Sequence, residues 1–160
     1  MSEKRMPRLW RLLKPETISL NLKEKRKKNV IEELINLLVE TKKIPDKMKA
    51  LQRVLEREQM ISTGIGEGVA IPHAKYDQIT KPLLAFGRSD DGLKFESLDG
   101  QKVHLIFLLL SPKEDPSKYV KLLGKTARLL NNSDLREALK SAQTPEEIIN
   151  TIKEAERKLR

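Results

Sequence analysis

The chain has 160 residues, enough for one domain with its own hydrophobic core, and it contains no cysteine. Disulfide bonds, thiolate metal ligands and cysteine nucleophiles are therefore excluded. The formal net charge is +9, but residues 1–28 carry ten Lys/Arg against three Glu and so account for +7 of it. The other 132 residues, with 22 basic and 20 acidic side chains, are close to neutral.

The composition argues against a membrane protein and against a dedicated nucleic-acid binder. No apolar run approaches the roughly 18 residues of a membrane span, and no continuous apolar stretch follows the charged N-terminus as in a secretory signal. The six aromatic residues are scattered, so they form no platform for stacking single-stranded bases. We therefore expect a cytoplasmic protein without membrane insertion, whose basic N-terminus attracts nucleic acid only weakly and in a salt-sensitive way.

The first half of the chain predicts one strand and two helices. Residues 18–22 alternate apolar and polar side chains, which indicates a short strand. Apolar residues then recur at helical spacing over 24–42, which predicts an amphipathic helix. Pro45-Asp46 opens a second helix that is expected to run to about Glu58. The side chains expected on its buried side are Met48, Leu51, Val54 and Leu55.

The second half predicts two longer strands followed by helices. Residues 83–89 and 103–110 are strand candidates, and the near-continuous apolar run of the second is typical of a strand covered on both faces. Asp90-Asp91-Gly92 predicts a turn after the first of them. Three helix starts follow, namely Asp115-Pro116, Ser133 as a cap, and the capping box Thr144–Glu147. The whole predicts an α/β domain with a mixed central sheet and helices on both sides.

A glycine-spaced segment, Ser62–Lys75 (STGIGEGVAIPHAK), carries the candidate site. Three glycines within it oppose a helix, and Pro72 favours an extended residue before it, so His73 is expected at a strand end with a restricted backbone. Hydroxyl side chains and accessible backbone N–H groups in such a loop are able to form a concavity that holds an anion. The glycine spacing matches neither the dinucleotide fingerprint nor the Walker sequence.

These residue types suit the acceptance of a phosphoryl group on His73. Neutral imidazole is a good nucleophile near pH 7, and phosphoryl transfer mainly requires positioning and charge neutralisation. Arg57 supplies a guanidinium with two-pronged phosphate geometry, and Thr63 a hydroxyl. His104, the other histidine, begins the apolar strand and is interpreted as structural, with a supporting role beside the site as the alternative. A metal is not expected, since no second His and no Cys lie at ligand spacing.

Arg57-Glu58 followed by Ser62–Lys75 closely resembles the signature of enzyme IIA domains of the bacterial phosphotransferase system (PTS), fructose/mannitol class, including the nitrogen-regulatory IIA proteins. The similarity also takes in the segments KVHLIFLLLSP and SAQTPEEI. It implies a basic N-terminal extension at residues 1–11 and a type-2 IIA domain at residues 12–156, folded as an α/β sandwich with a mixed sheet. The sequence shows no IIB or IIC segment beside this domain, so a free-standing protein is expected.

The resemblance implies that His73 is the phosphorylated residue, that Arg57 is the active-site arginine and that Thr63 is the hydroxyl beside the phosphohistidine. Ser62 and Gly64 are expected to support the phosphate site. Tyr119 stands where the family often has a second histidine; it is able to donate a hydrogen bond but not to change charge near neutral pH, so donor choice, rate or pH dependence is expected to differ.

The resemblance also implies the partners and leaves two functions open. Family members receive phosphate from the phosphocarrier protein HPr or its nitrogen-branch relative, and sugar-specific members pass it to a IIB domain, with no cofactor. The first hypothesis is therefore a phosphotransferase component of sugar uptake acting through a phosphohistidine. The alternative is a regulatory module whose phosphorylation state controls binding to a target protein. A nucleic-acid binder that uses the basic N-terminus is a third and weaker hypothesis.

Overall fold

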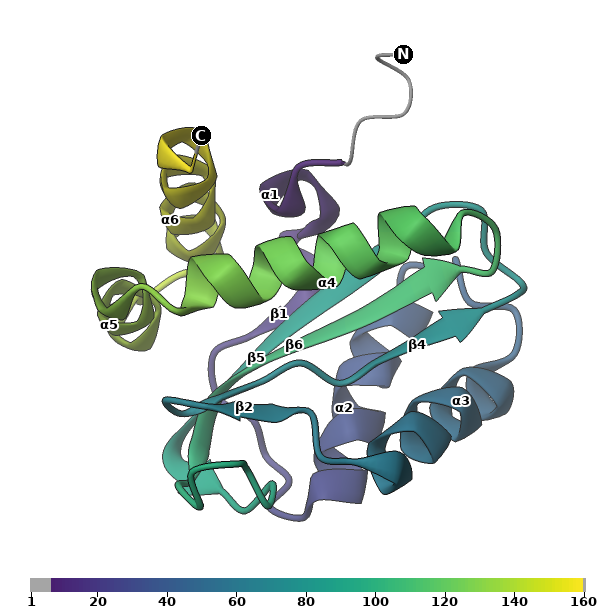
Figure 1. Ribbon diagram of the computed structural model, residues 1–160, viewed down its shortest axis with the longest axis horizontal. Coiled ribbons are helices and arrows are strands. Elements are labelled where there is room, and N and C mark those ends of the chain that lie inside the picture. The colour runs from purple at the N-terminus through teal and green to yellow at the C-terminus, as the bar shows by residue number, and fades with distance from the viewer. Residues whose placement is uncertain (1–6, 160) are drawn as a thin grey trace.

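A computed structural model describes residues 7–159, and within them the chain forms helices on both faces of a mixed sheet (Figure 1). The strands are β1 (Ile18–Ser19), β2 (Gly64–Gly66), β3 (Val69–Ala70), β4 (His73–Tyr76), β5 (Leu83–Leu93) and β6 (Val103–Pro112). The helices are α1 (Leu9–Leu12), α2 (Lys27–Val39), α3 (Lys47–Met60), α4 (Pro116–Leu130), α5 (Ser133–Ser141) and α6 (Pro145–Lys158), with a 3-10 turn, η2, at Pro15–Thr17. The fold class predicted from the sequence is confirmed.

The sheet is organised around β6. This strand pairs antiparallel with β5 on one side and parallel with both β3 and β4 on the other, while β1 extends the sheet beyond β5 and β2 beyond β3. β3 and β4 thus follow one another along the same edge of β6, separated by Ile71-Pro72. His73 begins β4 opposite Leu109, directly after this interruption, which is the strand-end position expected for it.

Two apolar cores lie on the two faces of the sheet. Alternate residues of β6 point to opposite sides, as the period of a strand requires. Ile106, Leu108 and Leu110 pack in the core beneath α2 and α3. Leu105, Phe107 and Leu109 pack in the core formed with α1, α4, α5 and α6. Because both faces of β6 are covered, a polar residue at every second position would be buried. This explains the continuous apolar sequence of the strand.

Several local predictions are wrong in instructive ways. β5 continues through Asp90-Asp91-Gly92 to Leu93, because the extra residues form a bulge between Arg88 and Leu93 instead of a turn. Met48 is 66% exposed, because α3 begins at Lys47 and turns Ala50, Leu51 and Val54 towards the core. α5 is capped by the side chain of Asn132, which accepts from two backbone N–H groups, and not by Ser133.

The segment around α1 packs against the C-terminal helix α6 (Figure 1). Leu9 and Leu13 are buried, and the carboxylate of Glu156, itself buried, accepts hydrogen bonds from the backbone N–H groups of Leu9 and Trp10, both at 2.8 Å. Lys125 pairs with the same carboxylate at 2.6 Å. Residues 1–6 of the predicted basic extension lie outside the described residues, and its boundary at residue 11 stays a prediction.

Arg88 is a buried cation that caps the C-terminal end of α5 by donating hydrogen bonds to its last carbonyls. Its Nη1 donates to the carbonyls of Leu139, Lys140 and Ala142 at 2.7–3.1 Å, and its Nε donates to Leu20 at 3.1 Å. An Arg88→Met variant leaves these carbonyls without a donor. We expect it to lower the free energy of unfolding by about 2–3 kcal/mol in urea denaturation, whereas Arg128→Met, at an exposed position of α4, changes it by less than about 0.5 kcal/mol. A loss of under about 1 kcal/mol for Arg88→Met would contradict this account.

Candidate phosphoryl-acceptor site

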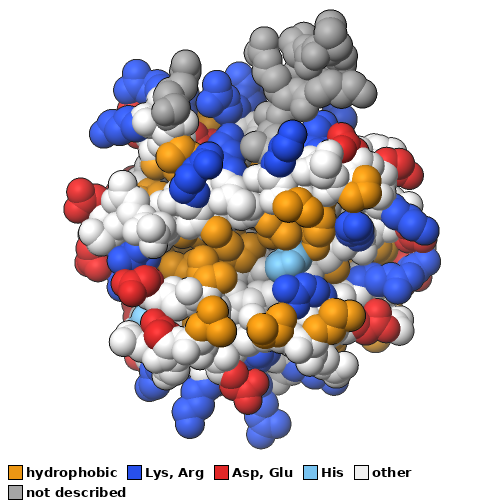
Figure 2. Space-filling view, in the orientation of Figure 1, with side chains coloured by type: hydrophobic (Ala, Val, Ile, Leu, Met, Phe, Trp, Pro, Cys, Tyr) orange, Lys and Arg blue, Asp and Glu red, His pale blue; other side chains and the backbone are white. Residues whose placement is uncertain are grey.

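Three elements bring the candidate residues together. α3 ends at Met60 and carries Arg57 in its last turn, β4 begins with His73, and α4 carries Tyr119 near its N-terminus. β4 and β6 are parallel neighbours, so the chain that leaves β6 at Pro112 turns back over the sheet as α4 on the side of His73. The three side chains line one surface depression of about 350 Å³. Figure 2 shows a histidine in such a hollow on the molecular surface, bordered by hydrophobic and basic side chains.

The imidazole of His73 is half-buried and held by the backbone. Its Nδ1 lies 2.6 Å from the carbonyl oxygen of Ile71. A carbonyl only accepts, so this contact places the ring hydrogen on Nδ1 and leaves a lone pair on Nε2. The ring therefore has the tautomer in which Nε2 is the nucleophile.

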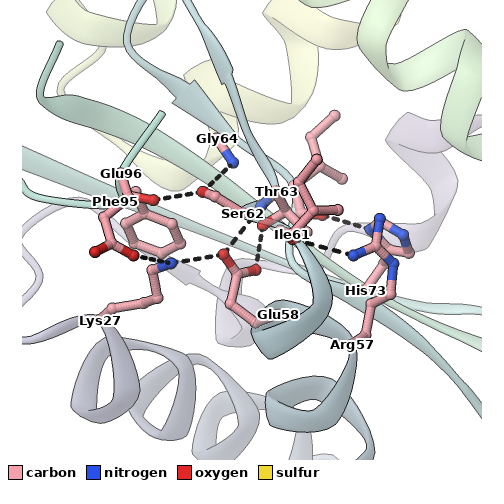
Figure 3. Close-up of polar contacts among 11 residues, drawn as sticks. Lys27, Arg57, Glu58, Ile61, Ser62, Thr63, Gly64, His73, Phe95 and Glu96 are labelled. Carbon is pink, nitrogen blue, oxygen red and sulfur yellow. Dashed lines mark hydrogen bonds and ion pairs between the residues drawn. The ribbon is translucent and has the colours of Figure 1, made fainter. Parts of the chain in front are cut away.

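Arg57 and Tyr119 flank this imidazole. The Nη1 of Arg57 donates to the carbonyl of Ile61 at 3.1 Å, which caps the end of α3 and turns the guanidinium towards the His73 ring (Figure 3). The Tyr119 ring lies at a centroid distance of 5.9 Å from the imidazole, tilted by 58°. The Nζ of Lys75 lies 5.5 Å from the centre of the Tyr119 ring. The site thus combines a nucleophile, two nearby cations and a hydroxyl.

Burial and charge act on both titratable rings. Burial lowers the pKa of His73 because it disfavours the charged ring; the Arg57 guanidinium acts in the same direction, and the Ile71 carbonyl and Glu58 oppose both. Burial raises the pKa of Tyr119 to about 12, against the opposing effect of Arg57. At neutral pH, His73 is therefore neutral and nucleophilic, while Tyr119 keeps its hydrogen as a donor.

A pH titration of His73 is expected to show this shift. Followed by NMR, the ring should titrate below the ordinary value of about 6.5. Between 6.5 and the lower folded pKa, the unfolded chain binds a proton that the folded chain does not. The stability linked to His73 is therefore present above pH 6.5 and lost as the pH falls through the folded pKa. A midpoint above 6.5 would show that burial is not the dominant influence.

The predicted hydroxyl residues lie beside the depression and not in its lining. Thr63 is only 4% exposed; its hydroxyl donates to Glu58 Oε1 at 2.6 Å and its backbone N–H to Glu58 Oε2 at 2.9 Å. The hydroxyl of Ser62 donates to the carbonyl of Phe95 and accepts from Gly64 N–H at 3.0 Å. Gly64 packs so closely on the loop that a Cβ there would lie 2.2 Å from Ser97 Oγ. Contacts of these residues with a phosphoryl group stay a prediction.

Glu58 belongs to the motif that carries the family resemblance, but no role in the site was predicted for it. The residue is 6% exposed, and its carboxylate accepts from Thr63 twice and from Lys27 Nζ at 2.8 Å (Figure 3). Lys75 was also missed, although a signal existed, because residues i and i+2 of a strand share a face and Lys75 follows His73 at that spacing. No comparable signal exists for the Lys27–Glu58 pair, since the two residues are 31 positions apart.

His104 lies far from His73 along β6. His104 lies opposite Gly68 at the other end of β6, and its Nδ1 is 2.9 Å from the carbonyl oxygen of Ser89. His73 lies opposite Leu109 of β6, which is five residues further along this strand than His104. At about 3.3 Å per residue, the two histidines are separated by about 16 Å along the strand direction. Within residues 7–159, no three His, Cys, Asp or Glu side chains are grouped to hold a metal ion, and no helix is both long and apolar enough to cross a membrane.

Comparison with known proteins connects this geometry to a family. Residues 11–155 match the family described as phosphoenolpyruvate-dependent sugar phosphotransferase system, EIIA 2. The fructose-specific EIIABC component of Bacillus subtilis is 39% identical over 91% of this chain, which spans only 23% of that protein. The fructose-specific EIIA component of Haloferax volcanii is 35% identical over 87% of this chain and 90% of its own length.

A solved structure agrees in fold and in length. The nitrogen regulatory protein IIA-Ntr of Neisseria meningitidis superposes with a TM-score of 0.84 at 30% identity, covering 90% of this chain and 98% of its own. Sugar-specific and nitrogen-regulatory proteins are thus both among the relatives. The chain belongs to the EIIA 2 family of the phosphoenolpyruvate-dependent sugar phosphotransferase system.

Proposed function

We propose that this protein accepts a phosphoryl group on Nε2 of His73 from an HPr-type phosphocarrier and passes it to a IIB domain in sugar uptake. The observation that carries the proposal is the hydrogen bond of 2.6 Å between Nδ1 of His73 and the Ile71 carbonyl, beside the Arg57 guanidinium. It gives a neutral nucleophile on a restricted backbone next to a cation. Membership of the family supports the same chemistry.

The transfer needs no metal or cofactor in this account. The lone pair of Nε2 attacks phosphorus, the Nε2–P bond forms as the donor's N–P bond breaks, and the electron pair of that bond returns to the donor nitrogen. Since the transition state is loose, the protein contributes mainly position and charge. Arg57 and Lys75 would neutralise the phosphoryl oxygens, Tyr119 would donate a hydrogen bond, and the Ile71 carbonyl would stabilise the phosphorylated ring through Nδ1–H.

The surroundings of the site suit a protein donor. Met60, Ile61 and Val120, on the elements that flank His73, are 79%, 57% and 63% exposed. Exposed apolar side chains gathered around a polar site are typical of a surface that another protein covers. Figure 2 shows hydrophobic side chains on both sides of the histidine, with basic side chains between them. An acidic or neutral partner surface complements this face.

The direct test is to supply a phosphorylated HPr-type protein and follow the mass of the chain. The proposal predicts a gain of one phosphoryl group per chain, labile in acid and stable in base, as a nitrogen-bound phosphate is. Inorganic phosphate alone serves as the control and should give no gain. A base-labile label, or none with either an HPr-type donor or its nitrogen-branch relative, would contradict the proposed function.

A regulatory role is the second candidate, because a nitrogen-regulatory protein is among the relatives. The nitrogen regulatory protein IIA-Ntr of Neisseria meningitidis is 30% identical to this chain and superposes with a TM-score of 0.84. In this role, phosphorylation of His73 would change binding to a target protein. A pull-down with unphosphorylated and phosphorylated protein separates the two functions, because regulation requires a target other than a IIB domain whose binding depends on phosphate.

A further inference from the structure

A continuous chain of hydrogen bonds joins Lys27 on α2 to the imidazole of His73. Lys27 Nζ donates to Glu58 at 2.8 Å, and Thr63 donates to the same carboxylate through its N–H and its hydroxyl. The carbonyl of Thr63 accepts from Ile71 N–H at 3.0 Å. The carbonyl of Ile71 then accepts from Nδ1 of His73 at 2.6 Å. Figure 3 shows the Lys27, Glu58 and Thr63 part of this chain on the far side of the loop from Arg57.

This chain of hydrogen bonds begins at a partly buried ion pair between Lys27 and Glu58, which fixes the loop. The Glu58 side chain is 4% exposed and that of Lys27 21% exposed. Lys27 also lies 3.9 Å from Glu96 and 5.0 Å from the centre of the Phe95 ring. Because a buried carboxylate needs its donors, Thr63 is held against Glu58 at two points, and residues 62–64 have little freedom to move.

The fixed position of Thr63 is passed to His73 through the backbone of Ile71. When Thr63 is fixed, its carbonyl holds the backbone N–H of Ile71, and the carbonyl of Ile71, in the next peptide group, is the acceptor for Nδ1–H. Neither Lys27 nor Glu58 is among the residues that line the depression around His73.

We propose that the Lys27–Glu58 ion pair is a positioning device that holds His73 in the tautomer and orientation needed to accept a phosphoryl group. Their positioning effect on His73 runs through Thr63 and Ile71. The expected effect on the rate of phosphoryl acceptance rests on the proposed function. The tautomer of His73 tests the positioning role without any transfer reaction.

The variants are Lys27→Met, which removes the cation and keeps most of the stem, and Glu58→Gln, which removes the carboxylate charge. Lys28→Met is the matched control, because Lys28 is the next residue of α2, is exposed, and pairs with no carboxylate within residues 7–159. Lys27→Arg is the rescue variant, since a guanidinium at this position keeps a cation that is able to reach Glu58. Far-UV circular dichroism confirms that each variant is folded.

Two measurements decide the proposal. In long-range 1H–15N NMR spectra, we expect Lys27→Met and Glu58→Gln to lower the fraction of His73 rings with hydrogen on Nδ1, while His104 serves as an unchanged internal reference. With an HPr-type donor, the maximal rate of phosphoryl acceptance should fall about tenfold at an unchanged half-saturating donor concentration. Lys27→Arg should recover most of the Nδ1–H fraction and most of the maximal rate, and Lys28→Met should match the wild type in both measurements.

The contrary results are equally defined. If both variants lower the melting temperature but keep the wild-type His73 spectrum and maximal rate, the ion pair is merely structural and the inference is wrong. If Glu58→Gln does not fold, Lys27→Met decides alone. If the wild-type protein accepts no phosphoryl group, the proposed function fails, while the NMR comparison still confirms or overturns the positioning role.

Discussion

A His73→Gln variant is expected to accept no phosphoryl group from an HPr-type donor, under conditions in which the wild-type protein is fully labelled. Glutamine has a similar reach and keeps a polar, neutral end, but its amide nitrogen has no available lone pair to attack phosphorus. The measurement is intact-protein mass spectrometry after incubation with the donor. The loss should be complete, since no other side chain in the depression around His73 is a neutral nitrogen nucleophile at pH 7.

The chain supplies its own control for this prediction. His104→Gln replaces the second histidine at the opposite end of β6, where Nδ1 contacts the Ser89 carbonyl, and it should be labelled like the wild type. If His73→Gln is still labelled, His73 is not the acceptor. If His104→Gln alone loses the label, the acceptor has been assigned to the wrong end of the sheet.

An Arg57→Ala variant is expected to accept the phosphoryl group about 100- to 1,000-fold more slowly. Arg57 provides the guanidinium nearest the reacting ring, and removal of one fixed donor from a developing anionic centre has costs of this order. Arg57→Lys should recover part of the rate, because lysine keeps the charge but lacks the two-pronged geometry. Single-turnover rates with an HPr-type donor measure both effects.

Arg57 also has a structural role that must be separated from its chemistry. Its Nη1 caps α3 at Ile61, so far-UV circular dichroism and the melting temperature are needed to show that Arg57→Ala remains folded. A second readout does not depend on transfer: removal of the cation should raise the pKa of His73. A folded Arg57→Ala variant with a wild-type rate and an unchanged His73 titration would show that the guanidinium does not act on the ring.

Much of the architecture followed from local patterns that tertiary contacts did not override. The continuous apolar run of β6 predicted coverage on both faces, and its residues divide between the two cores accordingly. Asp115 and Thr144 do cap α4 and α6. Their signals are short-range, because the cap and the N–H that it accepts from are three residues apart in the chain.

The errors arose where long-range packing decides the outcome. Asp90-Asp91-Gly92 has turn chemistry, yet β5 and β6 resume pairing at Leu93 and Val103, so the residues become a bulge. Met48 has the apolar character of a core residue, but the first turn of α3 leaves it exposed. Neither outcome is encoded in a window of a few residues.

The candidate site shows the same division. Its grouping of His73, Arg57 and Tyr119 was expected from the resemblance to the family, and the structure brings these three together in one depression. The Lys27–Glu58 pair had no sequence signal, because Lys27 lies in a run of four basic residues at the start of α2, and such a run usually indicates a solvated helix end. The engagement of the Thr63 hydroxyl by Glu58 was likewise not predictable, since it depends on burial of the carboxylate.

The central claim is that Nε2 of His73 is the atom that forms the bond to phosphorus. Phosphorylated protein labelled with 15N, studied by 31P–15N coupling in NMR, identifies the bonded nitrogen directly. The account predicts coupling from phosphorus to Nε2 of His73, with the hydrogen retained on Nδ1. Coupling to Nδ1 would require the 2.6 Å contact with the Ile71 carbonyl to break, and would contradict the account, as would phosphorus on any other residue.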